Sequence, residues 1–251
     1  MKKKIILLSL SIIMMQISFA NSIGIGYGVS DNIFKTDKKE KNILPLVDLE
    51  YEYKDFFIKS SGIQDWSVGY KLYEGENYKF TVYTLPFGGY TVKAGDMVSD
   101  YKGIDDRNTQ FMGGSEFAYT FLPYEIDSVI SFEYGKEGGT IGINLSKPLY
   151  ITQNLSITPN INYDYYTHKF VDYYFGIKSD EINKSSNIKN TYKGKNAYKY
   201  GIGISANYKI TENFSAIGFV EINKYSKEIS NSPITRDNII KTIGGGIIYL
   251  F

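Results

Sequence analysis

The chain has 251 residues, with 24 tyrosines and 24 glycines but only six prolines and no cysteine. The lack of cysteine excludes a disulfide framework and a thiolate metal site, and 28 basic against 27 acidic residues give no reason to expect a nucleic-acid partner. Tyrosine and glycine at this frequency are typical of β-strands, bends between them, and aromatic belts at a membrane interface.

Residues 1–20 have the pattern of a secretory signal peptide and are excluded from the fold. Three lysines at positions 2–4 precede an apolar stretch over 5–17, and Ser-Phe-Ala at 18–20 supplies the small-x-small pattern for cleavage after Ala20. Removing these lysines lowers the 28 basic residues to 25, so the mature chain carries a small negative charge. The apolar stretch is shorter than the roughly 20 residues of a membrane-spanning helix, and no later stretch reaches that length.

The rest of the sequence alternates between apolar and polar residues. Over 198–210 (YKYGIGISANYKI) even positions are apolar and odd positions are small or polar, which predicts a strand with one apolar and one polar face. We predict twelve strands: 22–30, one ending near 53, 56–62, 66–73, 78–90, one ending at 121, 125–135, 139–152, 155–167, 198–210, 214–225 and 239–251. The third and fourth could instead form one bulged strand, and ten strands is the alternative count.

The connections between these strands alternate in length. Short turns are expected at Lys54, Glu74, Leu122, Gln153 and Thr211. Long polar connections cover 31–42, 91–108, 169–197 and 226–238, whereas those near Gly62 and Gly138 are short. Short periplasmic turns, long outward loops and an even strand count characterise outer-membrane barrels.

Alternation alone also fits a soluble lipocalin-like barrel, whose apolar face points inward. The apolar side chains of these strands would not fill a twelve-stranded tube, and the aromatic residues are spread over all strands. The last strand ends on Tyr249 and Phe251 after Gly246, a pattern typical of the outer-membrane assembly signal. We therefore predict an all-β fold: a closed antiparallel transmembrane β-barrel of about 12 strands over residues 21–251, in the outer membrane of a Gram-negative bacterium.

The sequence assigns no catalytic, cofactor-binding or metal-ligating residue, so we expect a non-enzymatic protein without a cofactor. His168, the single histidine, lies where a strand meets the longest connection, a position that some outer-membrane enzymes use for catalysis. Thr167 and Asp172 are near it in sequence, but no serine lies within ten residues. We interpret His168 as a solvated rim histidine.

The other polar and glycine-rich segments can also be explained without a catalytic, metal or phosphate site. The carboxylates of the second long connection lack the spacing of an EF-hand, and we expect them to be solvated or bridged by divalent ions to lipopolysaccharide: Asp96, Asp100, Asp105 and Asp106. The glycine runs 24–28 and 244–246 lead into no helix that could hold a phosphate. Charged residues on the polar faces are expected to form a lumenal network that plugs the tube or lines a pore: Lys71, Lys79, Glu116, Glu133, Asp164, Lys199 and Glu221.

Several short motifs occur in an order that resembles the MipA/OmpV family. They are LPL at 44–46, DFF at 55–57, GYKL at 69–72, YYFGI at 173–177, KITENF at 209–214, SPI at 232–234, and a final Tyr-x-Phe. The resemblance spans residues 22–251. It implies an outer-membrane barrel with a non-enzymatic role, which in the namesake member is to bring a lytic murein transglycosylase together with a murein synthase.

Three functions stay open at this stage. The first is a scaffold for murein-synthesising and murein-cleaving enzymes; the second is a small-solute porin or a surface adhesin, and the third is a hydrolase around His168. The partners that we expect are outer-membrane lipid and lipopolysaccharide and, by resemblance, a murein transglycosylase and a murein synthase. We expect no nucleic acid, and we expect a monomer.

Overall fold

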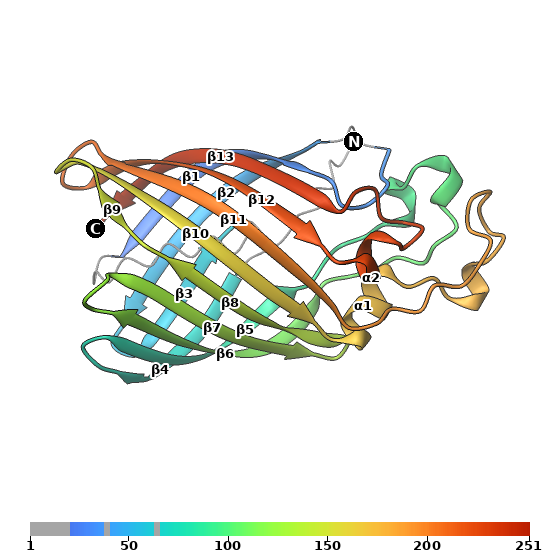
Figure 1. The fold of residues 1–251 in the computed structure, drawn as a ribbon, viewed down its shortest axis with the longest axis horizontal. Helices are drawn as coiled ribbons and strands as arrows, with labels where there is room; N and C mark the ends of the chain where they lie inside the picture. The colour runs from blue at the N-terminus through green and yellow to red at the C-terminus, as the bar shows by residue number, and fades with distance from the viewer. Residues whose placement is uncertain (1–20, 38–40, 63–65) are drawn as a thin grey trace.

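The computed structural model describes residues 21–37, 41–62 and 66–251 and shows a β-barrel with folded connections at one end (Figure 1). The predicted signal peptide lies outside the described residues. In the described part of the chain, each helix is too short or not apolar enough to span a membrane. The strands are β1 (Ser22–Asp31), β2 (Lys41–Tyr53), β3 (Phe56–Ser61), β4 (Trp66–Glu74), β5 (Tyr78–Gly88), β6 (Gln110–Phe121), β7 (Ile126–Gly135), β8 (Gly138–Ser146), β9 (Leu149–Tyr150), β10 (Leu155–Tyr166), β11 (Ala197–Lys209), β12 (Phe214–Tyr225) and β13 (Ile239–Leu250).

The strands form one closed antiparallel ring. Apart from the short β9, each strand pairs with the next in chain order, β8 pairs with β10, and β13 pairs with β1 from Ser22↔Leu250 to Ser30↔Thr242. The short β9 pairs with β10 and continues the line of β8, so the two together act as one strand of the wall. The prediction of a closed twelve-stranded barrel is confirmed, and 56–62 and 66–73 are separate strands.

The apolar face of the wall points outward. Ile25 is 73% exposed and Ile243 is 58% exposed, whereas the neighbouring Thr242 and the inward Lys199 are buried. An outward apolar band with a polar interior is the arrangement of a transmembrane barrel and the reverse of a lipocalin. The structure thus decides the question that alternation alone left open.

The two ends of the barrel differ. One end, the turn end, carries the short turns 54–55, 75–77, 122–125, 151–154 and 210–213; both Asn21 and Phe251 also lie there, because the Phe251 N–H donates to the Asn21 carbonyl at 2.9 Å. The other end, the loop end, carries the long connections and the helices α1 (His168–Phe175) and α2 (Lys227–Ser230) (Figure 1). The predicted alternation of short and long connections is confirmed.

The structure corrects three details of the strand prediction. The strand expected over 139–152 is interrupted at Lys147-Pro148, because proline has no N–H for the ladder. The strand expected over 78–90 ends at Gly88, after a register shift around Pro86. The connection over 169–197, expected to be long and polar, contains most of helix α1, which was not predicted from the sequence.

Candidate functional site

Aromatic side chains from three connections meet at the loop end. Phe34 follows β1, Tyr90 follows β5 and Phe175 ends α1 after β10, so the three come from well-separated points of the ring. The Phe34 and Phe175 rings stack at 5.2 Å, and Tyr90 meets them edge-on at 5.8 and 5.6 Å. The connections 32–37, 89–109 and 167–196 therefore pack against one another across the barrel mouth. The connection 226–238 joins them through the buried Ile229 and Ile234, and we call the four connections the cap.

The cap has an apolar core of its own. Its fully buried members include both short apolar pairs and isolated residues within polar sequence: Ile33, Phe34, Val92, Met97, Val171, Tyr174, Phe175, Ile188, Ile229 and Ile234. The inward side chains of Tyr166, Ala197, Tyr225 and Ile240 at the strand ends belong to the same cluster. Buried apolar area of this extent stabilises a fixed arrangement of the connections.

Helix α1 connects the cap to the barrel rim. Thr167 caps the helix by accepting from the Phe170 N–H, and its hydroxyl also accepts from the Gly139 N–H of β8 at 2.9 Å. Asp172 accepts from the Gly194 N–H at 2.7 Å, which holds the returning segment against the helix. Two residues that the sequence placed near His168 therefore have structural roles.

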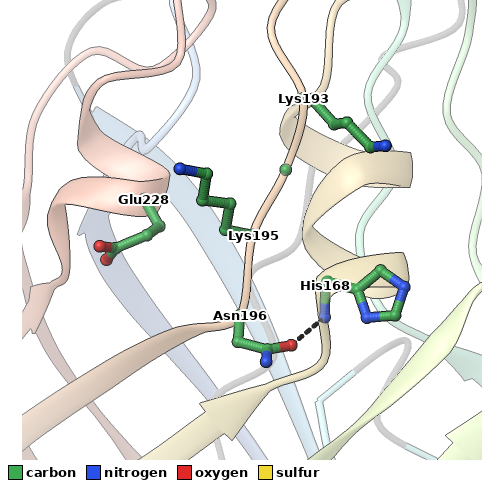
Figure 2. Close-up of a pocket in the computed structure, with 6 residues that line it drawn as sticks. His168, Lys193, Lys195, Asn196 and Glu228 are labelled. Atoms are coloured by element: carbon green, nitrogen blue, oxygen red, sulfur yellow. Dashed lines mark hydrogen bonds between the residues drawn. The ribbon is translucent and has the colours of Figure 1, made fainter.

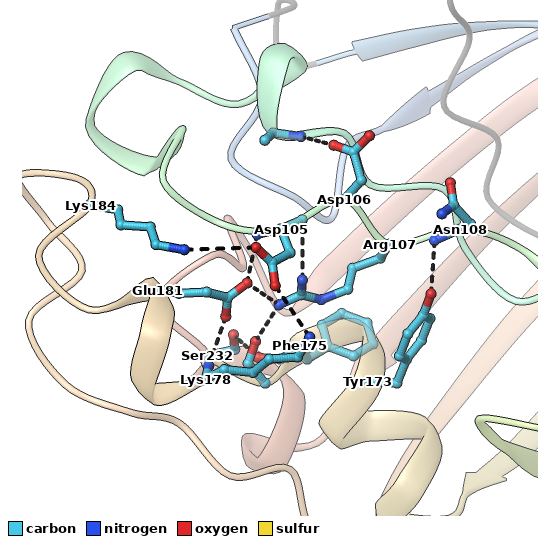
Figure 3. A network of polar contacts seen from close by, with 12 residues as sticks. Asp105, Asp106, Arg107, Asn108, Tyr173, Phe175, Lys178, Glu181, Lys184 and Ser232 are labelled. Atoms are coloured by element: carbon cyan, nitrogen blue, oxygen red, sulfur yellow. Dashed lines mark hydrogen bonds and ion pairs between the residues drawn. The ribbon is translucent and has the colours of Figure 1, made fainter.

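A buried ion pair joins two cap connections (Figure 3). Arg107 Nη2 lies 2.7 Å from Glu181 Oε1, and the side chains are 1% and 0% exposed. The Glu181 carboxylate also accepts from the backbone N–H groups of Asp105 and Lys178, each at 2.7 Å. Arg107 further donates to the carbonyl oxygens of Asp105 at 2.8 Å and Gly176 at 3.2 Å. These extra hydrogen bonds make burial of two charges tolerable.

The acidic residues of the second connection are mostly engaged within the cap. Asp105 pairs with Lys178 at 3.3 Å, and Asp106 pairs with Lys93 at 3.1 Å. Asp100 accepts from the Asn187 side chain. Among the described residues, no group of three or more His, Asp or Glu side chains is placed to hold a metal ion. Solvation alone was thus an incomplete interpretation, because these carboxylates connect one part of the cap to another.

His168 lies at the exposed start of α1, beside a shallow pocket (Figure 2). Its backbone N–H donates to Asn196 Oδ1 at 2.6 Å. The pocket is lined by His168, Lys193, Gly194, Lys195, Asn196 and Glu228. Within the described residues, the imidazole makes no hydrogen bond or ion pair with a hydroxyl or a carboxylate, so these residues form no Ser-His-acid arrangement of the kind that acyl transfer requires.

Inside the barrel, an ion network lies near the turn end. Glu52 accepts from Lys71 at 3.2 Å and Lys79 at 3.4 Å, and Lys59 lies 3.6 Å away. Lys59 also pairs with Glu50 at 2.7 Å. The sequence had indicated Lys71 and Lys79 but missed Glu52, Glu50 and Lys59, although their alternate positions on β2 and β3 place them on the polar face.

A second group of polar contacts lies nearer the loop end. Lys199 pairs with Asp164 at 2.7 Å, and Glu221 accepts from the Asn162 amide at 2.9 Å. Glu133 accepts from the Tyr83 hydroxyl at 3.0 Å. The seventh predicted residue, Glu116, pairs with Thr81 in the ladder and interacts electrostatically with Lys59 and Lys79. All seven predicted charges therefore lie on the inward face.

Tyrosine hydroxyls connect this lumenal group to the cap. The Tyr90 hydroxyl, from the cap, interacts with those of Tyr166 and Tyr225, the last residues of β10 and β12. The three lie beside Lys199 and Asp164, which contribute to their electrostatic environment. Burial raises the pKa of Tyr90, so this hydroxyl stays protonated in the folded cap.

Comparison with known proteins gives consistent matches over nearly the whole chain. A family model described as MltA-interacting protein MipA matches residues 23–251. The 24 kDa outer membrane protein of Pasteurella multocida (strain Pm70) is 29% identical over 236 residues, covering 92% of this chain and 90% of the relative. The MltA-interacting protein of Escherichia coli (strain K12) is 23% identical over 233 residues, with the same coverage of 92% and 90%.

Solved structures with a similar outline include two porins. The NanC porin aligns with a TM-score of 0.46 at 11% identity, and the KdgM porin with a TM-score of 0.48 at 9% identity. Each alignment covers 92% of this chain and 99% of the porin chain.

Proposed function

We propose, from the premise that this chain belongs to the MltA-interacting protein (MipA) family of outer-membrane β-barrel proteins, that it acts as a non-enzymatic scaffold whose loop end is closed by the cap. In barrels of this type short turns face the periplasm, so the turn end would present the surface for periplasmic partners. Murein-cleaving and murein-synthesising enzymes are the partner classes that we propose, because a relative is named for its interaction with MltA.

The packing of the cap is the main observation in favour of a closed barrel mouth. An open porin needs a continuous aqueous path, but here Phe34, Tyr90 and Phe175 meet across the mouth and are almost fully buried. The Arg107–Glu181 pair holds two of the contributing connections together. A barrel mouth closed by these contacts favours a structural role over solute passage.

Direct binding tests the scaffold. The detergent-solubilised barrel is immobilised and offered a purified lytic transglycosylase and a purified bifunctional murein synthase, separately and together. We expect each to bind, and the barrel to retain more of one in the presence of the other. An unrelated outer-membrane barrel is the control. Absence of binding to both enzymes, by a barrel that keeps its heat-modifiable gel migration, would reject the proposal.

A small-solute channel is the second candidate, and the inward face favours it. Among the described residues, carboxylates on this face outnumber lysines: Asp48, Glu50, Glu52, Glu116, Asp127, Glu133, Asp164 and Glu221 against Lys59, Lys71, Lys79 and Lys199. A polar lumen of this charge would favour cations over anions. Planar-bilayer recording separates the two functions, because the capped scaffold gives no conductance steps, whereas a channel gives cation-selective steps without any change to the cap.

A further inference from the structure

Two lysines that form no ion pair within 4.0 Å in the described part of the chain lie at one corner of the loop end, above β10 and β11, in a pocket that also contains Glu228. Lys193 and Lys195 line the pocket beside His168 (Figure 2). Within the described residues, neither amine lies within 4.0 Å of a carboxylate oxygen. Other cap lysines do form such pairs: Lys93 with Asp106 at 3.1 Å, Lys102 with Asp37 at 3.0 Å, and Lys178 with Asp105 at 3.3 Å.

The backbone fixes the position of these two lysines. Gly194, between them, donates to Asp172 Oδ1 at 2.7 Å and approaches α1 so closely that an added Cβ would lie 2.2 Å from the Asp172 nitrogen. Lys195 points towards Glu228, whereas Lys193 and His168 lie on the opposite side, next to α1 (Figure 2). A hydrogen bond from Ser226 lowers the pKa of Glu228, and the charges of Lys195 and Lys227 lower it further.

Tyrosines cover the outward wall directly below this corner. Tyr163 of β10 is opposite Tyr200 of β11 in the ladder, and both point outward with Tyr198. The Tyr163 and Tyr198 rings stack at 6.0 Å, and Tyr198 and Tyr200 at 6.5 Å. Tyr198 follows Lys195 by three residues, which in an extended chain is about 10 Å. The segment that carries Lys193 and Lys195 therefore begins just beyond an aromatic patch on the membrane-facing wall.

We propose that this corner binds a phosphorylated glycolipid of the outer leaflet, namely lipopolysaccharide through its lipid A part. Lys193 and Lys195 would meet the phosphates, and the tyrosine patch would pack against the sugar rings and the first carbons of the acyl chains. Lys193 and Lys195 outnumber the single carboxylate of the pocket, Glu228, and this excess of positive charge favours an anion. The membrane-facing position of the tyrosines favours a lipid over a soluble anion. The proposal rests on the location in the outer membrane and is independent of any murein enzyme.

The first test measures lipid A binding by native mass spectrometry of the full barrel in detergent. A Lys193→Gln/Lys195→Gln variant loses two cations near the phosphates, and we expect about 30-fold weaker binding of bis-phosphorylated lipid A. The matched control, Lys102→Gln/Lys178→Gln, removes two cap lysines that already have carboxylate partners and should bind like wild type. Equal binding by the Lys193→Gln/Lys195→Gln variant and wild type would overturn the proposal, as would equal weakening in both double variants. Heat-modifiable migration verifies that each variant is folded.

A second set of measurements identifies the ligand class. Removing the phosphates from lipid A should weaken its binding to wild type at least as much as the Lys193→Gln/Lys195→Gln substitution weakens binding of bis-phosphorylated lipid A. Tyr198→Leu, which keeps the wall apolar, should weaken lipid A binding while leaving the barrel folded. Inorganic phosphate at millimolar concentration should not displace lipid A; complete displacement would indicate a soluble-anion site and contradict the lipid assignment.

Discussion

Arg107 and Glu181 form an ion pair of 2.7 Å in the cap, although 74 residues separate them in the sequence. Arg107 belongs to the connection between β5 and β6, and Glu181 belongs to the connection between β10 and β11. The pair therefore ties together two connections that leave the barrel rim at different points. Because both side chains are excluded from solvent, neither charge can be hydrated when the other is removed.

Glu181→Gln tests how far the cap depends on this pair. The substitution leaves the Arg107 charge buried without its counterion, and loss of one partner of a buried pair costs about 3–5 kcal/mol. We expect the cap to become sensitive to protease and its amides to exchange faster, while the barrel keeps its heat-modifiable migration. Asp105→Asn is the control, since that carboxylate is 43% exposed and its loss should cost less than about 1 kcal/mol. Equal protection of wild type and Glu181→Gln would show that the pair is dispensable.

Phe175→Ala tests whether the apolar core closes the mouth. The truncation removes a ring that contacts both Phe34 and Tyr90, and large-to-small changes of a buried phenylalanine cost about 3–5 kcal/mol. We expect ion-conductance steps in planar bilayers that wild type lacks. The control variant, Phe111→Ala, removes an outward ring that is 64% exposed. It should give no conductance steps. If the Phe175→Ala barrel gives no conductance steps, the apolar core of the cap does not control ion passage through the barrel.

Lys199→Met tests the lumenal pair next to the cap. Asp164 would keep its charge without Lys199, which lies 2.7 Å away in the native barrel, so the free energy of unfolding should fall by about 3–5 kcal/mol. Unfolding in urea, followed by loss of the heat-modifiable band, gives the measurement. A Lys199→Met/Asp164→Leu variant should recover most of the loss, because no unpaired charge is left. Additive losses in the double variant would mean that the two residues act separately.

The wall of the barrel could be predicted from sequence for a local reason. Strand side chains alternate with a period of two, and each short turn is encoded within a few residues, as at Lys54 or Thr211. Inward charges such as Lys71 and Lys199 follow from the same period. Pro86, at the register shift of β5, and Pro148, at the break between β8 and β9, are visible in the sequence, but their effect depends on which ladder hydrogen bonds each position must supply.

The cap could not be predicted in the same way. Its apolar residues, such as Phe34, Val92 and Ile234, have no common period and come from different connections. The Glu181 carboxylate lies among polar neighbours in the sequence and looks solvated until Arg107 is brought to it by packing. The signals available were Thr167 as a helix N-cap and the large apolar residues within otherwise polar connections, and neither identifies a partner.

We expect alkaline pH to destabilise the cap, because the pKa of Tyr90 is raised in the folded protein. Burial raises its pKa above that of an unfolded tyrosine, which is about 10. The neutral hydroxyl therefore adds stability that is complete below about pH 10 and is lost as the pH rises through the raised pKa. We expect protease resistance of the cap to fall with increasing pH above about 10, measured between pH 8 and 12. Tyr90→Phe removes one of the titrating hydroxyls and should make that fall less steep, whereas Tyr124→Phe, at the turn end, should leave it unchanged. Identical pH profiles for wild type and Tyr90→Phe would assign the alkaline opening to other groups.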